Sequence, residues 1–227
     1  MSPRPYQLGK RKKQIDDGRR RIIDAARSLL AEADSYTGFT VDAVAKRADV
    51  ARATIYYQFD SKTGLLEALC DALAEAGQLS ELSAAFTNPD PSKALRSFVA
   101  SFGRFWAVDR LVMRRLRALA ALDPEVGAVI SARDERRRTG LRVLAGRLGD
   151  EGVTTIEPER AASLLFVLTS FETFDALADP EQELTEVVRD VLELAEAALL
   201  MPVSTETSAP SDGSRRSPPD NLRRSNA

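Results

Sequence analysis

Hydrophobic residues recur along most of this chain at intervals of three and four, the spacing that places them on one face of an α-helix. Asp90-Pro91, Asp123-Pro124 and Glu157-Pro158 each put a proline where a helix can begin without losing a hydrogen bond. The pattern predicts an all-α fold of about nine helices, which cover approximately residues 19–33, 40–48, 51–58, 61–76, 91–108, 111–119, 123–148, 158–178 and 180–201.

Two short predicted helices lie close together within residues 39–62. Thr40 is a candidate N-cap for the first, because its hydroxyl can accept a hydrogen bond from an amide two or three residues further on. Asp49 suits the turn that follows, since aspartate tolerates the left-handed backbone conformation better than most residues. Ile55 and Phe59 face inward from the second helix. This arrangement predicts a helix-turn-helix that reads DNA.

The outer face of the second helix carries side chains suited to DNA. Arg52 can pair with a guanine edge or a phosphate, and the methyl group of Ala53 or Thr54 can contact a thymine methyl. Two adjacent tyrosines and a lysine beyond them offer hydroxyl and ammonium groups to phosphates. The candidate DNA-binding residues are Thr40, Arg52, Ala53, Thr54, Tyr56, Tyr57, Gln58 and Lys62.

The same stretch resembles the DNA-binding domain of the TetR family of transcriptional regulators over about residues 19–73. The residues that carry the resemblance are Phe39-Thr40, Val44-Ala45, Ala48, Val50, Thr54-Ile55-Tyr56-Tyr57, Phe59, Ser61-Lys62, Leu65 and Leu66. Two positions depart from the family pattern. Asp49 replaces the usual glycine, and Thr63-Gly64 replaces an acidic residue, which predicts a weak capping box for the next helix. The resemblance implies a dimeric repressor with a ligand pocket in a second helical domain.

Charge is distributed unevenly along the chain. Residues 1–62 hold 13 Lys and Arg against 8 Asp and Glu, whereas the remainder holds 19 against 26, within an overall net charge of −2. A basic first part attracts the phosphate backbone of DNA. We therefore expect a flexible basic arm over residues 1–18, a DNA-binding domain over 19–76, a ligand-binding and dimerisation domain over 77–202 and a disordered tail over 203–227.

The predicted second domain is rich in aromatic residues. Its candidate ligand-binding residues form a mostly apolar set with a few hydroxyls, as in small-molecule sites generally: Phe98, Phe102, Phe105, Trp106, Met113, Phe166, Thr169, Ser170 and Phe171. Aromatic stripes at helical spacing also form ordinary cores. The charged run over residues 133–138 is interpreted as a solvated helix face. If an effector exists, we expect a small hydrophobic or amphipathic molecule.

The last two predicted helices, at about 158–178 and 180–201, are apolar on more than one side. Such helices must be covered on two faces. We therefore expect them to pack against their copies in a homodimer, which implies a palindromic double-stranded DNA operator.

Other classes of protein find little support in the sequence. The chain has no histidine and one cysteine, and it lacks HExxH, paired CxxC and phosphate-loop motifs. We therefore expect no enzyme activity, cofactor or metal. No apolar run approaches 18 residues and no signal peptide is recognisable, so a cytoplasmic protein that does not enter a membrane is expected. A helical ligand-binding or scaffold protein without operator recognition is the alternative.

Overall fold

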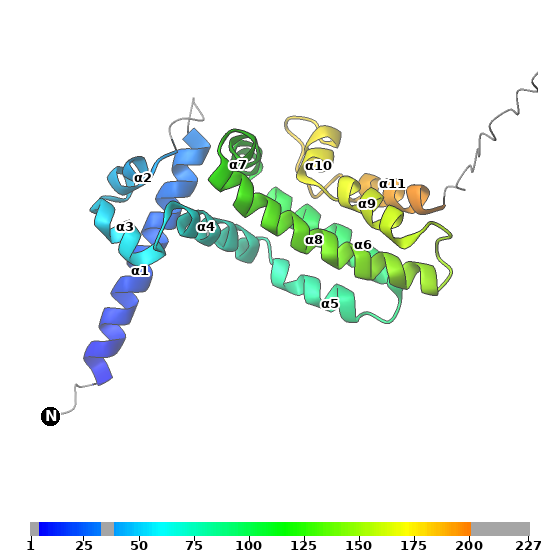
Figure 1. Cartoon of the computed structure of the whole chain (residues 1–227), viewed down its shortest axis with the longest axis horizontal. Helices are drawn as coiled ribbons and strands as arrows, with labels where there is room; N and C mark the ends of the chain where they lie inside the picture. The colour runs from blue at the N-terminus through cyan, green and yellow to red at the C-terminus, as the bar shows by residue number, and fades with distance from the viewer. Residues whose placement is uncertain (1–4, 33–38, 201–227) are drawn as a thin grey trace, which may run out of the picture.

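The computed structural model describes residues 5–32 and 39–200, and the side chains from Lys13 onward. These residues form eleven α-helices, one short 3-10 helix and no strand (Figure 1). The α-helices are α1 (Pro5–Glu32), α2 (Val41–Ala48), α3 (Arg52–Phe59), α4 (Lys62–Ala76), α5 (Leu82–Thr87), α6 (Pro91–Ala107), α7 (Arg110–Leu122), α8 (Pro124–Asp150), α9 (Pro158–Leu168), α10 (Phe171–Leu177) and α11 (Val188–Leu200). The all-α prediction is confirmed, with more helices than the nine expected.

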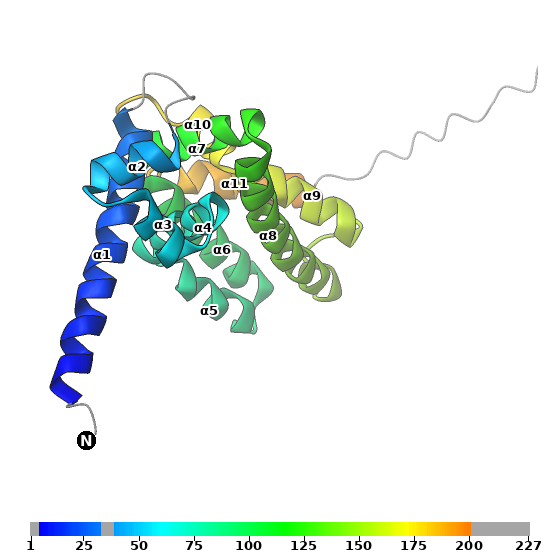
Figure 2. The same ribbon diagram turned by 60° about the vertical axis from the view of Figure 1, so that its left-hand side comes forward.

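The first helix begins much earlier than predicted. The segment interpreted as a flexible arm is helical from Pro5, and α1 extends past the other helices (Figure 2). No proline interrupts it, and its lysines and arginines favour helix formation. Arg19 also fastens α1 to α3, because its guanidinium donates to the Gln58 carbonyl at 2.6 Å and stacks 4.2 Å from the Phe59 ring centre. The predicted tail over 203–227 lies outside the described residues.

The helix-turn-helix follows the predicted local signals. The Thr40 hydroxyl accepts a hydrogen bond from the Ala43 amide at 3.1 Å and so caps α2. Asp49 has a φ of 52°, the left-handed conformation predicted for the turn. The apolar sides of both helices are buried, with Ile55 of α3 fully inaccessible. The face of α3 opposite Ile55 is thereby directed away from the core.

Gly64, at the beginning of α4, occupies a position where there is no room for a larger residue. A Cβ atom added to Gly64 would lie 2.0 Å from the Phe59 carbonyl oxygen, far closer than atoms can approach. Although the acidic side chain of a capping box is missing, Ser61 caps α4, since its hydroxyl accepts a hydrogen bond from the Gly64 amide at 2.9 Å. The sequence departure therefore permits the Phe59 carbonyl at the end of α3 to lie close to the first turn of α4.

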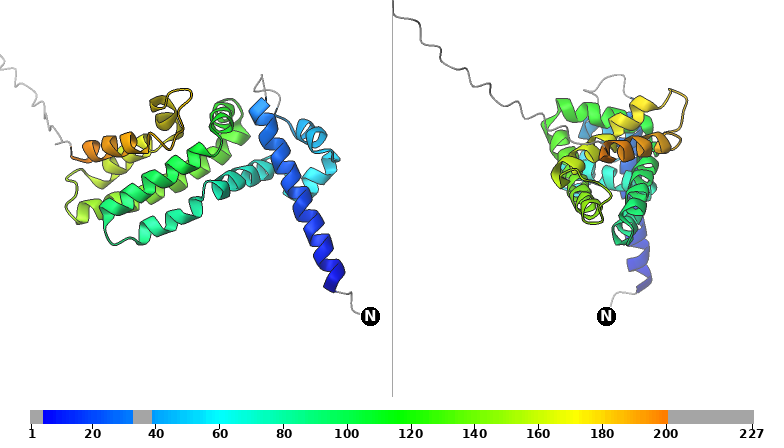
Figure 3. Two further views of the ribbon diagram at one scale, coloured as in Figure 1. Left: turned by 180° about the vertical axis from the view of Figure 1, so that it is seen from behind. Right: turned by 90° about the vertical axis from the view of Figure 1, so that its right-hand side faces the viewer.

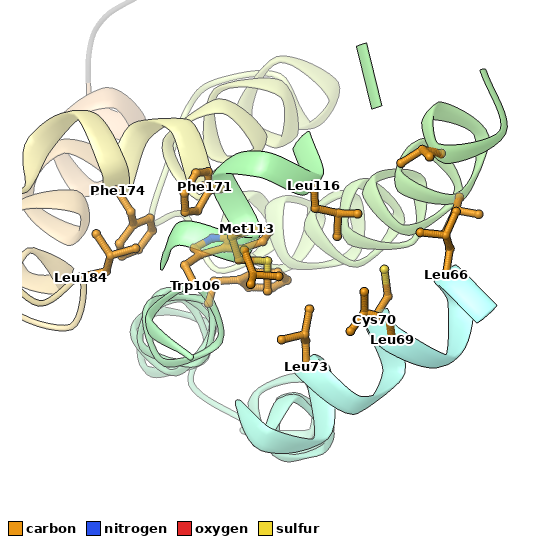
Figure 4. Close-up of a cluster of buried hydrophobic side chains, with 14 of the residues drawn as sticks. Leu66, Leu69, Cys70, Leu73, Trp106, Met113, Leu116, Phe171, Phe174 and Leu184 are labelled. Carbon is orange, nitrogen blue, oxygen red and sulfur yellow. The ribbon is translucent and has the colours of Figure 1, made fainter. Parts of the chain in front are cut away.

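The helices α5–α11 form a carboxyl-terminal bundle around α8. This long helix packs against α6, α7 and α9, and it also contacts α4; Figure 3 shows α6 and α8 side by side along the bundle. The buried apolar residues form one contiguous cluster that passes from Leu66 and Leu69 on α4 to Phe174 and Leu184 (Figure 4). Residues near the DNA-binding motif and in the bundle thus share one core. None of the described helices is sufficiently long and apolar to cross a membrane.

The predicted continuous helix over 158–178 is wrong, because the chain breaks at Thr169 and Ser170. Ser170 begins α10, its hydroxyl accepting a hydrogen bond from the Thr173 amide. The break leaves the Thr169 carbonyl free to accept a hydrogen bond from the Trp106 indole at 3.1 Å. The last helix also begins at Val188 instead of residue 180. The preceding turn is held by Arg110, whose guanidinium donates to the carbonyls of several residues, including Ala178, Asp179 and Gln182.

Replacing Gly64 with alanine is expected to destabilise the protein by about 1–3 kcal/mol, because the new methyl group overlaps backbone that cannot easily move. Gly146→Ala is a matched control, since that glycine lies within α8 and no atom lies within 4 Å of its added Cβ. This control should be neutral or stabilising by up to about 1 kcal/mol. Chemical denaturation measures both. Equal stability of the two variants would contradict the steric role assigned to Gly64.

Candidate nucleic-acid interface and effector cavity

Two tyrosines on the outer face of α3 are exposed to solvent, although folding does not require aromatic side chains there. Tyr57 is the most exposed large hydrophobic residue in the described part of the chain, with 81% of its surface accessible, and Tyr56 is 38% accessible. Arg52 and Ala53 are also exposed, while Thr54 is half-buried. Ile55 and Phe59, four residues apart, therefore form the buried side of α3, and the opposite side presents polar and aromatic residues to solvent.

Arg52 is held in place on this face. Its guanidinium donates to both carboxylate oxygens of Asp42, at 2.8 and 3.0 Å, and to the Tyr56 hydroxyl at 3.1 Å. The Tyr56 hydrogen bond and the Asp42 charge raise the pKa of Arg52 above its usual value, so its positive charge is secure. Arg52 would have to exchange Asp42 for a nucleotide in order to contact DNA.

Two other predicted DNA contacts are Thr40, at the beginning of α2, and Gln58, near the end of α3. The Thr40 hydroxyl uses its oxygen to cap α2, which leaves its own hydrogen for an external acceptor such as a phosphate. Gln58 is half-buried beside α1, with its side-chain nitrogen 3.3 Å from the Cβ position of Gly18. This placement directs Gln58 toward α1 and away from the open side of α3.

Lys62 has a different partner from the phosphate predicted for it. Its ammonium donates to a carboxylate oxygen of Asp123 and lies 3.5 Å from Glu125. Burial disfavours the charge on Lys62, but its hydrogen bonds and ion pairs with these two acids outweigh burial and raise its pKa. Lys62 therefore connects the beginning of α4 to the beginning of α8.

Three further contacts bind the DNA-binding helices to the bundle. The Arg27 guanidinium of α1 pairs with Asp109 at 2.7 Å, at the beginning of α7. Arg115 of α7 donates to the Leu30 carbonyl at 2.8 Å, near the end of α1. Arg133 of α8 donates to Asp71 on α4 at 2.7 Å. Polar links therefore join α1 and α4 to α7 and α8 on several sides.

A cavity of about 230 Å³ lies where α4 meets α5–α8. Five of the predicted ligand-binding residues line it: Phe98, Phe102, Phe105, Trp106 and Met113. Other apolar walls come from α4 and α5, including Leu73 and Phe86. The close-up in Figure 4 shows Leu73, Trp106, Met113 and Leu116 directed toward one another from three helices. The cavity is therefore chiefly apolar and adjoins α4 directly.

The other four predicted ligand-binding residues lie outside the lining and have structural partners instead. Phe166 packs beneath the guanidinium groups of Arg137 and Arg138. The Thr169 hydroxyl accepts from Arg137 at 2.9 Å. Ser170 caps α10, and the Phe171 ring packs against the opposite side of Trp106. These four side chains therefore stabilise the junction between α9 and α10.

One part of the cavity wall is charged, which the sequence interpretation missed. Four arginines and one aspartate line it: Arg117, Arg133, Arg136, Arg137 and Asp134. Most of them belong to the run interpreted as a solvated face. Arg133 and Arg137 are spaced four apart and continue the apolar stripe that contains Leu141, and this spacing was the available signal.

Arg137 is the most deeply buried of these cations, with its side chain 3% accessible. Burial lowers its pKa to about 10, although the nearby Asp134 carboxylate favours the charge. It remains protonated at neutral pH. Its Nη1 donates to the Phe166 carbonyl and the Thr169 hydroxyl, and its Nη2 donates to Asp134, but its Nε has no partner among the described residues. An unpaired buried donor of this kind is costly unless something accepts its hydrogen bond.

Residues 22–69 match the family described as "Bacterial regulatory proteins, tetR family". No curated protein sequence matches the chain significantly. The matched segment contains α2, α3 and most of α4, so it includes the exposed face of α3.

Solved structures with the same fold include several transcriptional regulators. The TetR family transcriptional regulator PfmR from Thermus thermophilus is 20% identical, with a TM-score of 0.60, covering 78% of this chain and 97% of that one. The fatty acid degradation regulator FadR from Bacillus halodurans is 23% identical, with a TM-score of 0.63 and coverages of 80% and 96%. A TetR transcription regulator from Haloarcula marismortui is 21% identical, with a TM-score of 0.60 and coverages of 82% and 100%.

Asp123→Asn is expected to cost about 1–2 kcal/mol at neutral pH, because it leaves the partly buried Lys62 without its main partner. Asp123→Ala should cost about 1 kcal/mol more, since Asp123 also caps α8 through the Glu125 amide at 2.9 Å and asparagine retains that cap. Glu125→Gln is the control, because that carboxylate is more exposed. Denaturant titrations of the variants measure these differences.

The advantage of the wild type over Asp123→Asn should depend on pH. The hydrogen bond from Lys62 lowers the pKa of Asp123. A carboxylate with a lowered pKa stabilises the fold above its unfolded-state pKa of about 3.9, and the stabilisation is lost as the pH falls through the folded-state value. Denaturation at a series of pH values should therefore show the two proteins converging in acid. A constant difference down to about pH 3 would contradict this ion pair.

Proposed function

This chain has the DNA-binding domain and the fold of TetR-family transcriptional regulators, and we propose that it is a repressor that a small hydrophobic or amphipathic ligand releases from its operator. The observation that carries the proposal is the open face of α3, where Arg52, Tyr56 and Tyr57 are exposed. Folding alone does not require two adjacent tyrosines outside. Base edges and phosphates in a major groove would satisfy their polar groups.

A homodimer would place two copies of α3 on one operator. Exposed apolar side chains on the outer side of the bundle support such a contact. They are Val143 on α8, Val167 on α9, and Leu194 and Leu200 on α11, between 44% and 72% accessible. Symmetric pairing through these helices implies a palindromic operator whose half-sites match the spacing of the two α3 helices.

The position of the cavity supports release by a ligand. Cys70, Leu73 and Ala74 of α4 line it, while the same helix begins at Lys62, directly after α3. A ligand that prefers one position of α4 would shift the population of α3 positions and thus the affinity for DNA. The apolar lining supports a hydrophobic ligand, and one structural neighbour is named for fatty acid degradation.

The first experiment is selection of bound duplexes from random DNA by the purified protein. We expect a palindromic sequence that is bound at least about a thousandfold more tightly than random DNA at physiological salt. Lack of any enrichment at low salt would reject operator recognition. A helical ligand-binding or scaffold protein would then be the better description.

Arg52→Ala is expected to relax sequence preference at one base pair of each half-site, at a cost of about 1–3 kcal/mol, because a bidentate contact to a base edge is lost. Lys93→Ala is the control, since it removes one exposed positive charge from the beginning of α6. Competition between the selected operator and single-base variants measures the preference. Equal losses on operator and random DNA would remove Arg52 from base reading.

Tyr57→Ala should weaken binding to operator and random DNA by a similar factor of about ten, since a phosphate contact carries no sequence information. Its thermal stability should match that of the wild type, because the side chain is almost fully exposed. Filter binding or fluorescence anisotropy measures affinity on the two DNAs. Wild-type affinity for both would exclude Tyr57 from the interface.

A further inference from the structure

We propose that the cavity binds a small carboxylic acid, with its apolar body among the aromatic side chains and its carboxylate at Arg136 and Arg137. The inference rests on the proposed effector role of the cavity and specifies the chemical class of the ligand. The apolar and charged parts of the lining are separate, so a bound molecule would need two chemically different ends.

The guanidinium groups around the cavity outnumber their carboxylate partners by one. Four guanidinium groups line it, whereas the carboxylates that pair with them are three: Asp134 with Arg117 and Arg137, Glu172 with Arg117, and Asp71 with Arg133. Arg136 pairs with no carboxylate among the described residues, and its only hydrogen bond there is a long one of 3.4 Å to the Ala132 carbonyl. A single negative charge would complete the balance.

Arg136 itself is exposed, so the buried donors of neighbouring residues on α8 carry the argument for a bound carboxylate. The Nε atoms of Arg133 and Arg137 are buried without a hydrogen-bond partner in the described part of the chain. Only 5% of the Arg137 surface is accessible, so bulk water does not readily satisfy it. A carboxylate accepts hydrogen bonds through two oxygens and suits the planar guanidinium well. A neutral alcohol could accept one hydrogen bond here but would leave the net positive charge unbalanced, and a cationic ligand would be repelled by that charge.

The remaining walls suit a small apolar body. Phe98, Phe102, Phe105 and Trp106 lie on successive turns of α6, with neighbouring ring centres 4.5–6.2 Å apart. On the facing helix α8, Gly140 allows close approach of Phe86, because a Cβ atom added to Gly140 would lie 2.8 Å from the Phe86 ring. The cavity is slightly smaller than the approximately 300–1,000 Å³ typical of drug-sized ligands, which favours a compact acid.

Trp106 makes binding measurable in the protein itself. It is the only tryptophan in the chain and it lines the cavity, so its fluorescence reports occupancy without a label. The probes are octanoate, octan-1-ol and octylamine, which share an apolar chain and differ in the charge of the head. Each is titrated into the full-length protein at neutral pH, in the absence of DNA and below the concentration at which it forms micelles.

We expect octanoate to bind at least about tenfold more tightly than octan-1-ol, and octylamine to bind most weakly. Arg136→Gln should remove most of the preference for octanoate and leave the affinity for octan-1-ol unchanged. Arg138→Gln is the matched control, because it removes the same charge from a nearby position of α8 but lies outside the lining. It should keep the preference.

Three outcomes would overturn the proposal. They are equal binding of acid and alcohol, tighter binding of the amine, and absence of fluorescence change or thermal stabilisation with every probe. A preference for octanoate that survives Arg136→Gln would overturn the assignment of the head to Arg136. The selection experiment on DNA is independent of these titrations. Operator binding with no preference for the acid would therefore reject the ligand class alone.

Discussion

Burial of one apolar face along α4 is the interaction on which both halves of the molecule depend. Leu65, Leu66, Leu69 and Leu73 are at most 2% accessible. Burying each such side chain contributes about 1.5–3 kcal/mol, so together they contribute as much as the net stability of a typical domain. The same helix packs against α1 and α3 at one side and α6 and α8 at the other. A displacement of α4 must therefore disturb both the α3 support and the cavity wall.

Polar contacts fix the direction of that shared helix. Lys62 attaches its beginning to the first turn of α8, and Arg133 attaches its middle to the same helix through Asp71 and the Glu67 carbonyl. Apolar packing alone would tolerate sliding by small amounts, whereas these hydrogen bonds require defined positions. A movement within the bundle could thus be transmitted to α3 through α4 and the ion pairs of Lys62 and Arg133.

Features set by neighbouring residues could be predicted from the sequence, and features set by distant contacts could not. The Thr40 cap, the Asp49 turn and the apolar side of α3 each depend on residues within one or two helical turns. The break at Thr169 and Ser170 depends on Trp106, more than sixty residues earlier. Five of nine predicted cavity residues line the cavity, four of them because α6 has a regular stripe and the fifth, Met113, from α7. Arg137 was missed because its neighbours in the run are charged, although its spacing continued the buried side of α8.

Under the base-reading role proposed for Arg52, its ion pair with Asp42 would affect how the protein searches along DNA. An arginine with an internal partner does not stand unpaired over a wrong base, because it can return to its own carboxylate. Non-cognate sites are then penalised less severely, and the barrier between successive registers of sliding is lowered. Asp42 would in this way give up some discrimination at each base pair for faster movement among sites.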